Sequence, residues 1–272
     1  KPISDDMVIE WGTADAKPKL FPPRENVLFV VTDKRAIAAR VVELRLRPVG
    51  KPIRYWPGQY VTVGDPRAGF PARAYSISNA PRPDGELVLH VARADGGVTS
   101  QWIHDELPVG ESIKINGAYG TFIGDPAVDT PVLCLAAGTG LAPILSLAEA
   151  ALRRGFRKPV MLLLSARTRE DAYAQGMLAW WRTKHRNFDY RITLTREQHD
   201  GFLHGRVDTV LPDLLPDLSR HTIFAAGSPE FTACCVDTCN SLGAAEDMIY
   251  TEGFFSVQQP VVASAERLLP TP

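Results

Sequence analysis

One short segment of the sequence gathers side chains that could hold an anionic ligand with an aromatic ring. In residues 69–81, the polar side chains Arg73, Tyr75, Ser76 and Ser78 are interspersed with small or apolar residues, in a run that predicts a β-strand. Arginine presents a planar fork to a pyrophosphate, tyrosine can stack on an aromatic ring, and a serine hydroxyl can hydrogen-bond to a ring nitrogen. A half-buried strand with one solvated face would show the same alternation, so the rest of the chain must distinguish the two interpretations.

Two glycine-containing turns could bind phosphate groups. Gly96 and Gly97 precede a helical pattern that starts near Thr99, and Gly138-Thr139-Gly140 lies between a buried strand pattern and a helix. Glycine lets the backbone approach a ligand closely, and the free N–H groups of a helix start favour an anion. The second turn lacks the third glycine of a dinucleotide fingerprint, because Pro143 takes that position. Each turn alone is equally consistent with a structural role, the first as a hairpin turn with Thr99 as a helix cap.

Two further loops follow buried strand patterns in the second half of the chain. In an open parallel sheet, ligands bind beyond the carboxyl ends of the strands, so we expect Gly138–Gly140 and Gly227–Pro229 to line one crevice. The other loop begins at Ser165 and contains Arg167 and Arg169. These arginines could pair with a phosphate on a ribose, although arginines in a loop are often only solvated.

The predicted secondary structure that positions these residues changes near residue 125, from short strands to alternating strands and helices. Residues 27–123 show short strand patterns separated by turn signals, with one helix predicted over 99–107. After residue 131, continuous apolar runs alternate with helical patterns, which is typical of βαβ units and a parallel sheet. The sequence therefore predicts an antiparallel β-barrel followed by an α/β domain. We place the boundaries at 1–25 for a linker, 26–125 for the barrel, 126–258 for the α/β domain and 259–272 for a C-terminal tail.

The composition argues against several classes of protein. The chain of 272 residues has 30 Lys and Arg, 31 Asp and Glu and a formal net charge of −1, which gives no basis for nucleic-acid binding. It has no run of about twenty apolar residues that would predict a membrane span. Its first residues lack the apolar stretch of a signal peptide. We therefore expect a soluble, cytoplasmic protein with no nucleic-acid or membrane partner.

The four cysteines do not predict a disulfide framework or a metal site. Cys234, Cys235 and Cys239 fall on one predicted helix, where reduced thiols are expected in a cytosolic protein. Cys234 and Cys239 have the C-x4-C spacing of a plant-type iron–sulfur site, but Leu242 stands where the next cysteine is needed. We interpret these thiols as packing residues.

Six motifs together resemble the ferredoxin–NADP reductase superfamily, in its bacterial branch of oxygenase-type reductases. They occur in that family's order and spacing between about residues 26 and 256. The motifs are R-A-Y-S (73–76), G-G-V-T-S (96–100), G-A-Y-G-T-F (117–122), A-A-G-T-G-L-A-P (136–143), A-G-S-P-E (226–230) and T-E-G-F-F (251–255). The resemblance implies a Greek-key barrel that binds a flavin, and an α/β domain that binds NADH or NADPH. It favours FAD over FMN.

The resemblance also implies individual roles. Arg73 and the turn Gly97–Ser100 would hold the flavin phosphates, and Tyr75 would pack on the isoalloxazine. Ser76 would hydrogen-bond near the hydride-accepting N5, and Glu252 would lie by the reacting rings, which makes these two the catalytic candidates. The implied flavin-binding residues are Arg73, Ala74, Tyr75, Ser76, His90, Val91, Ala92, Gly97, Val98, Thr99 and Ser100. The coenzyme-binding candidates are Gly138, Thr139, Gly140, Pro143, Ser165, Arg167, Arg169, Gly227, Ser228, Pro229, Glu252 and Phe254.

The residues at the end of one predicted strand bear on the choice between NADH and NADPH. Residues 163–169 contain no acidic side chain to bind a ribose 2′-hydroxyl and repel a 2′-phosphate. Arg167 and Arg169 could accept that phosphate, so NADPH use is predicted and dual use with NADH is consistent with the sequence. Ala226 stands where the family often has a cysteine near the nicotinamide, which leaves the reaction rate open.

The implied function is an NAD(P)H reductase that passes electrons to a ferredoxin or another iron–sulfur protein, in aromatic-ring dioxygenation. Residues 1–11 resemble the segment that follows a plant-type ferredoxin domain, so a [2Fe–2S] domain is expected to precede residue 1 in the full protein. The alternatives are a stand-alone ferredoxin or flavodoxin reductase, a reductase of a monooxygenase or of sugar deoxygenation, and an electron-transfer subunit that does not oxidise NAD(P)H.

Overall fold

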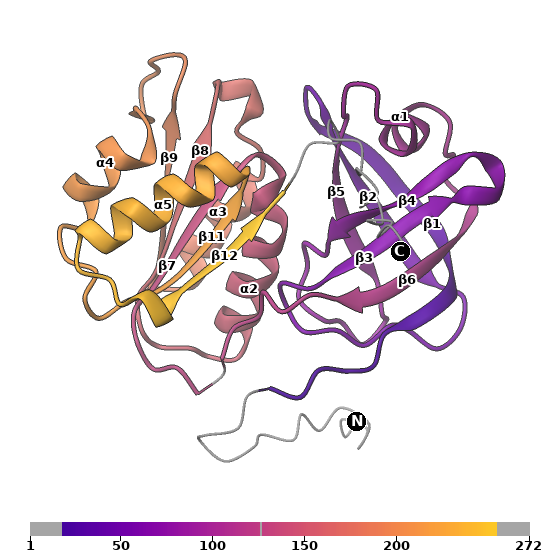
Figure 1. The fold of residues 1–272 in the computed structure, drawn as a ribbon, viewed down its shortest axis with the longest axis horizontal. Coiled ribbons are helices and arrows are strands. Elements are labelled where there is room, and N and C mark those ends of the chain that lie inside the picture. Colours follow the sequence, from indigo (N-terminus) through magenta and orange to yellow (C-terminus); the bar gives the residue numbers. More distant parts are fainter. Residues whose placement is uncertain (1–17, 126, 255–272) are drawn as a thin grey trace, which may run out of the picture.

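The computed structural model describes residues 18–125 and 127–254, which form two domains side by side (Figure 1). Most of the expected linker and all of the expected C-terminal tail lie outside the described residues. Strand β1 begins at Arg24, and the residues just before it lie on the barrel, where Phe21 stacks on Trp56 with ring centroids 6.1 Å apart.

The first domain is a curled antiparallel sheet of six strands in the order β4-β3-β6-β1-β2-β5. Its elements are β1 (Arg24–Ala38), β2 (Val41–Pro48), β3 (Tyr60–Asp65), β4 (Phe70–Ser76), β5 (Leu87–Ala92), α1 (Val98–Asp105) and β6 (Ser112–Tyr119), with a 3-10 turn at Pro66–Ala68. The expected antiparallel fold is thus confirmed. Ile77, just after the end of β4, forms a bridge with Leu89 of β5, and the sheet closes on itself there.

Alternation of side chains explains why this sheet curls around a core. In β2 and β5, Leu44, Leu46, Leu87, Leu89 and Val91 point into one apolar cluster with the inner residues of the other strands. The remaining side chains of β5 therefore point out of the barrel, because successive residues of a strand face opposite sides. The outward residues include His90, which is nevertheless buried.

The second domain is a parallel sheet of six strands in the order β10-β9-β8-β7-β11-β12. Its strands are β7 (Val132–Ala137), β8 (Val160–Ala166), β9 (Phe188–Leu194), β10 (Leu203–His204), β11 (Thr222–Gly227) and β12 (Ile249–Gly253). Its helices are α2 (Leu141–Arg153), α3 (Gln175–Lys184), α4 (Val207–Leu214) and α5 (Pro229–Ser241), with 3-10 turns at Gly138–Gly140, Arg169–Asp171 and Glu246–Met248. The expected α/β fold is confirmed.

Helices cover both faces of the parallel sheet. Helices α2 and α3 pack on one face, and α4 and α5 pack on the other. Cys235 and Cys239 lie in the second of these apolar layers. Burial raises the pKa of Cys239 to about 12, so this thiol stays protonated at neutral pH. Across residues 18–125 and 127–254, no helix is long and apolar enough to cross a membrane.

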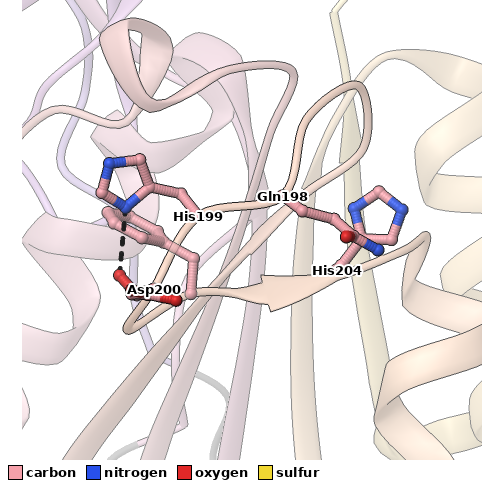
Figure 2. A pocket seen from close by; sticks show the side chains of 5 residues that line it. Gln198, His199, Asp200 and His204 are labelled. Atoms are coloured by element: carbon pink, nitrogen blue, oxygen red, sulfur yellow. Dashed lines mark hydrogen bonds between the residues drawn. The ribbon is translucent and has the colours of Figure 1, made fainter.

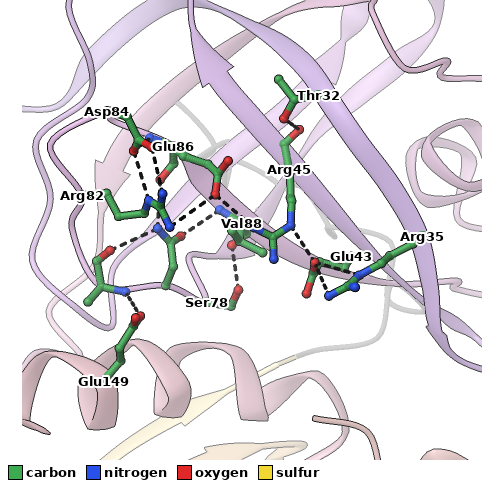
Figure 3. Close-up of polar contacts among 12 residues, drawn as sticks. Thr32, Arg35, Glu43, Arg45, Ser78, Arg82, Asp84, Glu86, Val88 and Glu149 are labelled. Carbon is green, nitrogen blue, oxygen red and sulfur yellow. Dashed lines mark hydrogen bonds and ion pairs between the residues drawn. The ribbon is translucent and has the colours of Figure 1, made fainter. Parts of the chain in front are cut away.

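Direct hydrogen bonds join the two domains beside helix α2. The Glu149 carboxylate accepts a hydrogen bond from the backbone N–H of Ala80 at 2.7 Å (Figure 3). The Ser146 hydroxyl donates to the carbonyl of Asn79 at 2.8 Å. Asn79 is itself fixed to β5, because its side-chain oxygen accepts from the N–H of Val88 at 2.8 Å. These contacts hold helix α2 against the closing end of the barrel.

Candidate functional site

The order of the parallel strands reverses between β7 and β11, which is where ligands bind in open sheets of this kind. The chain leaves β7 through the turn Gly138–Gly140 and leaves β11 through Gly227. A Cβ on Gly140 would lie 2.1 Å from the carbonyl oxygen of Ala226, so only glycine allows these two strand ends to approach. Gly138 has φ +55° and is exposed at the crevice. The structure thus brings the two expected loops together.

The second loop caps helix α5 with its own serine. The Ser228 hydroxyl accepts a hydrogen bond from the N–H of Phe231 at 3.2 Å, and Pro229 occupies the first turn, where its missing N–H costs little. The N–H of Phe254 donates to the carbonyl of Gly227 at 2.8 Å. The Ser228 hydroxyl therefore serves the helix, and the last described residue, Phe254, is tied back to the crevice.

Glu252 of β12 reaches the barrel domain. Its carboxylate oxygen accepts a hydrogen bond from the Ser76 hydroxyl at 3.5 Å, across 176 positions of sequence. Burial raises the pKa of Glu252 to about 7, against the opposing effect of the Ser76 contact. A carboxyl group in this state exchanges its proton near neutral pH. The two residues expected to be catalytic are therefore in contact at the seam between the domains.

Strand β4, which ends at Ser76, also carries the expected flavin residues Arg73, Ala74 and Tyr75. Arg73 and Ala74 are exposed, and the guanidinium of Arg73 contacts only the carbonyl of Ala72 among the described residues, at 3.2 Å. Tyr75 is half-buried, and burial raises its pKa to about 12 although Arg73 opposes the shift. An arginine with no acidic partner beside a partly buried aromatic ring suits a ligand that has both a phosphate and a ring.

The turn before α1 lies beside this strand, since the Thr99 hydroxyl donates to the carbonyl of Pro71 at 2.5 Å. The Ser100 hydroxyl donates to the carbonyl of Gly97 at 2.9 Å and accepts from the N–H of Ala94 at 3.1 Å. Both hydroxyls therefore shape the turn. Gly97 is the N-cap and offers no side chain to the first helical N–H groups. The first backbone N–H groups of α1, beginning with that of the exposed Val98, can therefore bind an anion.

His90 is an unusual residue of the seam, because its side chain is only 4% exposed and one nitrogen has no partner. Its Nε2 lies 3.8 Å from a carboxylate oxygen of Glu43, the residue opposite it on β2. Its Nδ1 is buried without a hydrogen bond among the described residues. Buried polar atoms are normally paired, so this nitrogen can make one further hydrogen bond. Val91 points into the barrel core, and Ala92 is exposed.

Glu43 itself was not expected from the sequence. It accepts hydrogen bonds from Arg35 at 3.1 Å and from Arg45 at 2.9 Å (Figure 3). Burial alone would raise the pKa of Glu43, but His90, Arg45 and Arg35 together lower it to about 2. The period-2 pattern of β2 places Glu43 on the outer face of the barrel, but no sequence signal shows that this face is covered.

The expected coenzyme residues at the carboxyl end of β8 lie beside the loop after β9, which was not expected from the sequence. Ser165, the next-to-last residue of β8, pairs with Ala137. The loop after β8 meets the loop after β9 through a hydrogen bond from the Arg196 N–H to the Arg167 carbonyl at 3.0 Å. The guanidinium of Arg169 contacts Nε2 of His199 at 3.1 Å.

The loop after β9 forms a cavity of about 450 Å³ (Figure 2). The cavity is lined by Gln198, His199, Asp200, Phe202 and His204. His199 packs edge to face on Phe202, with ring centroids 5.6 Å apart. The sequence contained evidence for a binding loop here, because residues 195–204 follow a predicted strand whose carboxyl end lies at the same sheet edge as Gly138.

Comparison with known protein families finds two adjacent domains in this chain. Residues 29–123 match the oxidoreductase FAD-binding domain, and residues 134–237 match the oxidoreductase NAD-binding domain. The orphaned His90 nitrogen, the unpaired Arg73 and the uncapped start of α1 fit an FAD group.

Characterised relatives are reductase components. The chain is 28% identical over 214 residues to the ferredoxin–NAD(P)+ reductase component of the naphthalene 1,2-dioxygenase system of Pseudomonas putida, covering 78% of this chain and 64% of that one. It is 31% identical over 219 residues to the CDP-6-deoxy-L-threo-D-glycero-4-hexulose-3-dehydrase reductase of Yersinia pestis, covering 79% and 64%. The matched region thus spans slightly less than two thirds of the length of these relatives.

Solved structures share the arrangement of both domains. The Amycolatopsis cytochrome P450 reductase GcoB superposes with a TM-score of 0.81 at 28% identity, covering 89% of this chain and 73% of that one. The ferredoxin reductase of carbazole 1,9a-dioxygenase superposes with a TM-score of 0.76 at 26% identity, covering 86% and 70%.

Proposed function

Because the chain belongs to the ferredoxin–NADP reductase superfamily, with an FAD-binding domain followed by an NAD-binding domain, we propose that it is a flavin-dependent NAD(P)H reductase. Its electrons would pass to a [2Fe–2S] ferredoxin or to an oxygenase, in aromatic-ring dioxygenation. The observation that carries the proposal is the contact between Ser76 and Glu252, which joins the expected flavin strand to the expected coenzyme crevice.

The barrel residues would hold FAD at two places. Arg73 and the free N–H groups of the turn Gly97–Ser100 would bind its pyrophosphate, and Tyr75 would lie against its ring system. The Nδ1 of His90 would gain the partner that it lacks among the described residues. When bound, FAD supplies hydride acceptance and the release of single electrons.

The α/β domain would bind NADH or NADPH along its carboxyl edge. Gly138–Gly140 would receive the pyrophosphate, because this turn lies at the reversal of strand order. The cavity after β9 lies farther along the same edge and is large enough to take part of the adenosine. Arg167 and Arg169 would pair with a 2′-phosphate, so NADPH is expected to be accepted as well as NADH.

Ser76 and Glu252 would act at the point where the two ring systems meet. The Ser76 hydroxyl can donate to Glu252 while the carboxyl is ionised, and can accept from it when a proton resides there. The pair would therefore hold a proton at the seam and keep water out of it. This role requires a carboxyl group that titrates near neutral pH, as Glu252 does.

The direct test is an anaerobic absorbance titration of the FAD-loaded chain with NADH and then NADPH. Bleaching of the flavin bands by either coenzyme supports the reductase. No bleaching with both would favour an electron-transfer subunit that receives its electrons from another protein.

The electron acceptor has a second candidate. The similarity to a sugar dehydrase reductase is as extensive as that to the dioxygenase components. Reduction of a purified dioxygenase ferredoxin by the NADH-reduced chain, compared with reduction of cytochrome c as a general acceptor, tests the choice. A ferredoxin rate no faster than the cytochrome c rate would contradict the dioxygenase assignment.

A further inference from the structure

The seam contains a set of contacts between the domains that the proposed hydride site does not use. The rings of His90 and Tyr173 meet edge to face, with centroids 5.2 Å apart and planes at 86°. The Tyr173 hydroxyl then donates to the carbonyl of Gly138 at 3.1 Å. A residue of the flavin-side strand thus touches the side chain that holds the coenzyme turn.

Tyr173 is well placed to control that turn. It is 5% exposed and lies between the 3-10 turn Arg169–Asp171 and helix α3. Around Gly138, by contrast, a Cβ would meet nothing within 4 Å, so packing does not fix this residue. Its carbonyl accepts hydrogen bonds from the N–H of Leu141 and from Tyr173. The orientation of the Gly138 carbonyl therefore depends on hydrogen bonds.

The orientation of that carbonyl decides where the next N–H points. A trans peptide is planar, so the N–H of Thr139 points opposite to the Gly138 carbonyl. While Tyr173 holds the carbonyl on the protein side, the N–H of Thr139 is turned to the other side of the turn. Such an N–H is a suitable donor to a phosphate oxygen.

The other end of the chain of contacts is fixed as well. His90 lies beside Glu43, and Glu43 is held by hydrogen bonds from Arg35 and Arg45. The ring of His90 therefore lies beside a carboxylate that is itself held by side chains of β1 and β2. It gives Tyr173 a firm surface that belongs to the other domain.

We propose that Tyr173 is a positioning residue for the coenzyme, because it orients the Gly138 turn and takes its own position from His90. The proposal rests on the proposed function only in naming the ligand as NAD(P)H. It adds that the barrel contributes to coenzyme affinity through a residue that is separate from Ser76 and Glu252.

The test compares two tyrosine-to-phenylalanine variants. Tyr173→Phe keeps the ring but removes the donor to Gly138. Tyr55→Phe is the matched control, since its buried hydroxyl also donates to a backbone carbonyl, that of Asn79 at 3.0 Å. NAD+ is titrated into each FAD-loaded protein, and the flavin difference spectrum gives Kd. We expect Tyr173→Phe to raise Kd about fivefold, the effect of one neutral hydrogen bond, with unchanged FAD affinity and an unchanged limiting rate of flavin reduction by saturating NADH.

The role of His90 is tested by a double-mutant cycle at saturating FAD. His90→Ala should raise the Kd for NAD+, and combined with Tyr173→Phe it should add less than its separate effect. Full additivity would overturn the His90 part of the proposal. A Kd in Tyr173→Phe equal to that of Tyr55→Phe would overturn the whole, as would an equal fall in FAD affinity, which a merely structural role would cause.

One measurement separates this proposal from the proposed function. Hydrogen exchange of the amides at 138–141 in the FAD-loaded, coenzyme-free protein does not depend on any reaction. Faster exchange there in Tyr173→Phe than in Tyr55→Phe supports the positioning role, and equal exchange contradicts it. Failure of NADH and NADPH to reduce the wild-type flavin would instead contradict the reductase.

Discussion

At the residue scale, Glu252 shows how burial changes the chemistry of one side chain. Its carboxyl has an ordinary pKa of 4.5, and burial at the seam raises this to about 7. Between these two pH values the folded chain holds a proton that the unfolded chain has lost. Stability therefore falls as the pH rises through this window, and the loss is complete above the folded pKa.

Glu252→Gln should remove this loss of stability, because an amide does not ionise. Relative to the wild type, the variant should gain on the order of 3 kcal/mol of unfolding free energy between pH 4.5 and pH 8. Urea unfolding of the FAD-free protein at both pH values measures the gain. If the variant and the wild type differed in stability by the same amount at both pH values, Glu252 would have an ordinary pKa in the folded chain.

Arg73 is the residue on which flavin retention should depend most. Arg73→Ala removes a guanidinium that has no acidic partner among the described residues, so the fold should persist while a charge-assisted contact to FAD is lost. We expect at least a tenfold rise in the Kd for FAD, corresponding to about 1.5–3 kcal/mol. The return of flavin fluorescence on dilution measures it. Arg67→Ala, in the turn just before the same strand, is the control, and equal Kd values in the two variants would contradict the contact.

Arg167 should affect one coenzyme more than the other. Arg167→Ala is expected to raise the KM for NADPH about tenfold and to leave that for NADH within twofold, because only NADPH carries the 2′-phosphate. Steady-state reduction of ferricyanide by each coenzyme measures both. The exposed Arg157 precedes β8 at its opposite end, so Arg157→Ala is the control. Equal changes for both coenzymes would exclude a role at the phosphate.

At the element scale, the backbone of a neighbouring strand limits which residues a turn after a parallel strand can contain. Gly140 lies where a side chain would collide with the backbone of β11, whereas Gly176 in α3 has open space around it. The two glycines are thus needed to very different degrees.

Gly140→Ala should force the turn away from β11, because its Cβ would meet the Ala226 carbonyl and no side chain can move aside. We expect a loss of about 1–3 kcal/mol of unfolding free energy and weaker NAD+ binding. Gly176→Ala should instead be neutral or stabilising by up to about 1 kcal/mol. Thermal unfolding of both variants tests this, and similar melting temperatures would be the contrary result.

At the scale of the whole molecule, the two domains act through the seam that joins them. Each domain has its own apolar core, and the hydrogen bonds made by Ser146 and Glu149 hold α2 to the barrel. Interfaces of this kind are more polar than a core and permit relative motion when weakened.

Removing both bonds should separate the unfolding of the two domains. We expect Ser146→Ala combined with Glu149→Ala to broaden or split the calorimetric transition of the FAD-free protein, since the buried N–H of Ala80 loses a charged partner. Glu111→Ala with Ser112→Ala, both exposed at the start of β6, is the control. A single transition of unchanged width in the seam variant would mean that other contacts join the domains.

Much of this molecule was open to prediction from local patterns. Period-2 alternation located the antiparallel strands, and continuous apolar runs followed by helical patterns located the βαβ units, because both signals depend only on which side of an element is buried. The strand β12 and the helix α4 were not predicted. Strand β12 is short and partly exposed, and α4 has Pro212 in its interior, which argues against a helix from sequence alone.

The sequence by itself determined the fold class, the family and the glycines at the strand ends, since these follow from residue types at short spacing. Only the tertiary structure decided which residues meet across the seam. The contact of Ser76 with Glu252 and the placement of His90 between Glu43 and Tyr173 join segments that no local pattern connects. The raised pKa of Glu252 and the unpaired nitrogen of His90 have the same origin. Both arise because a second domain removes water from side chains that a single strand would leave exposed.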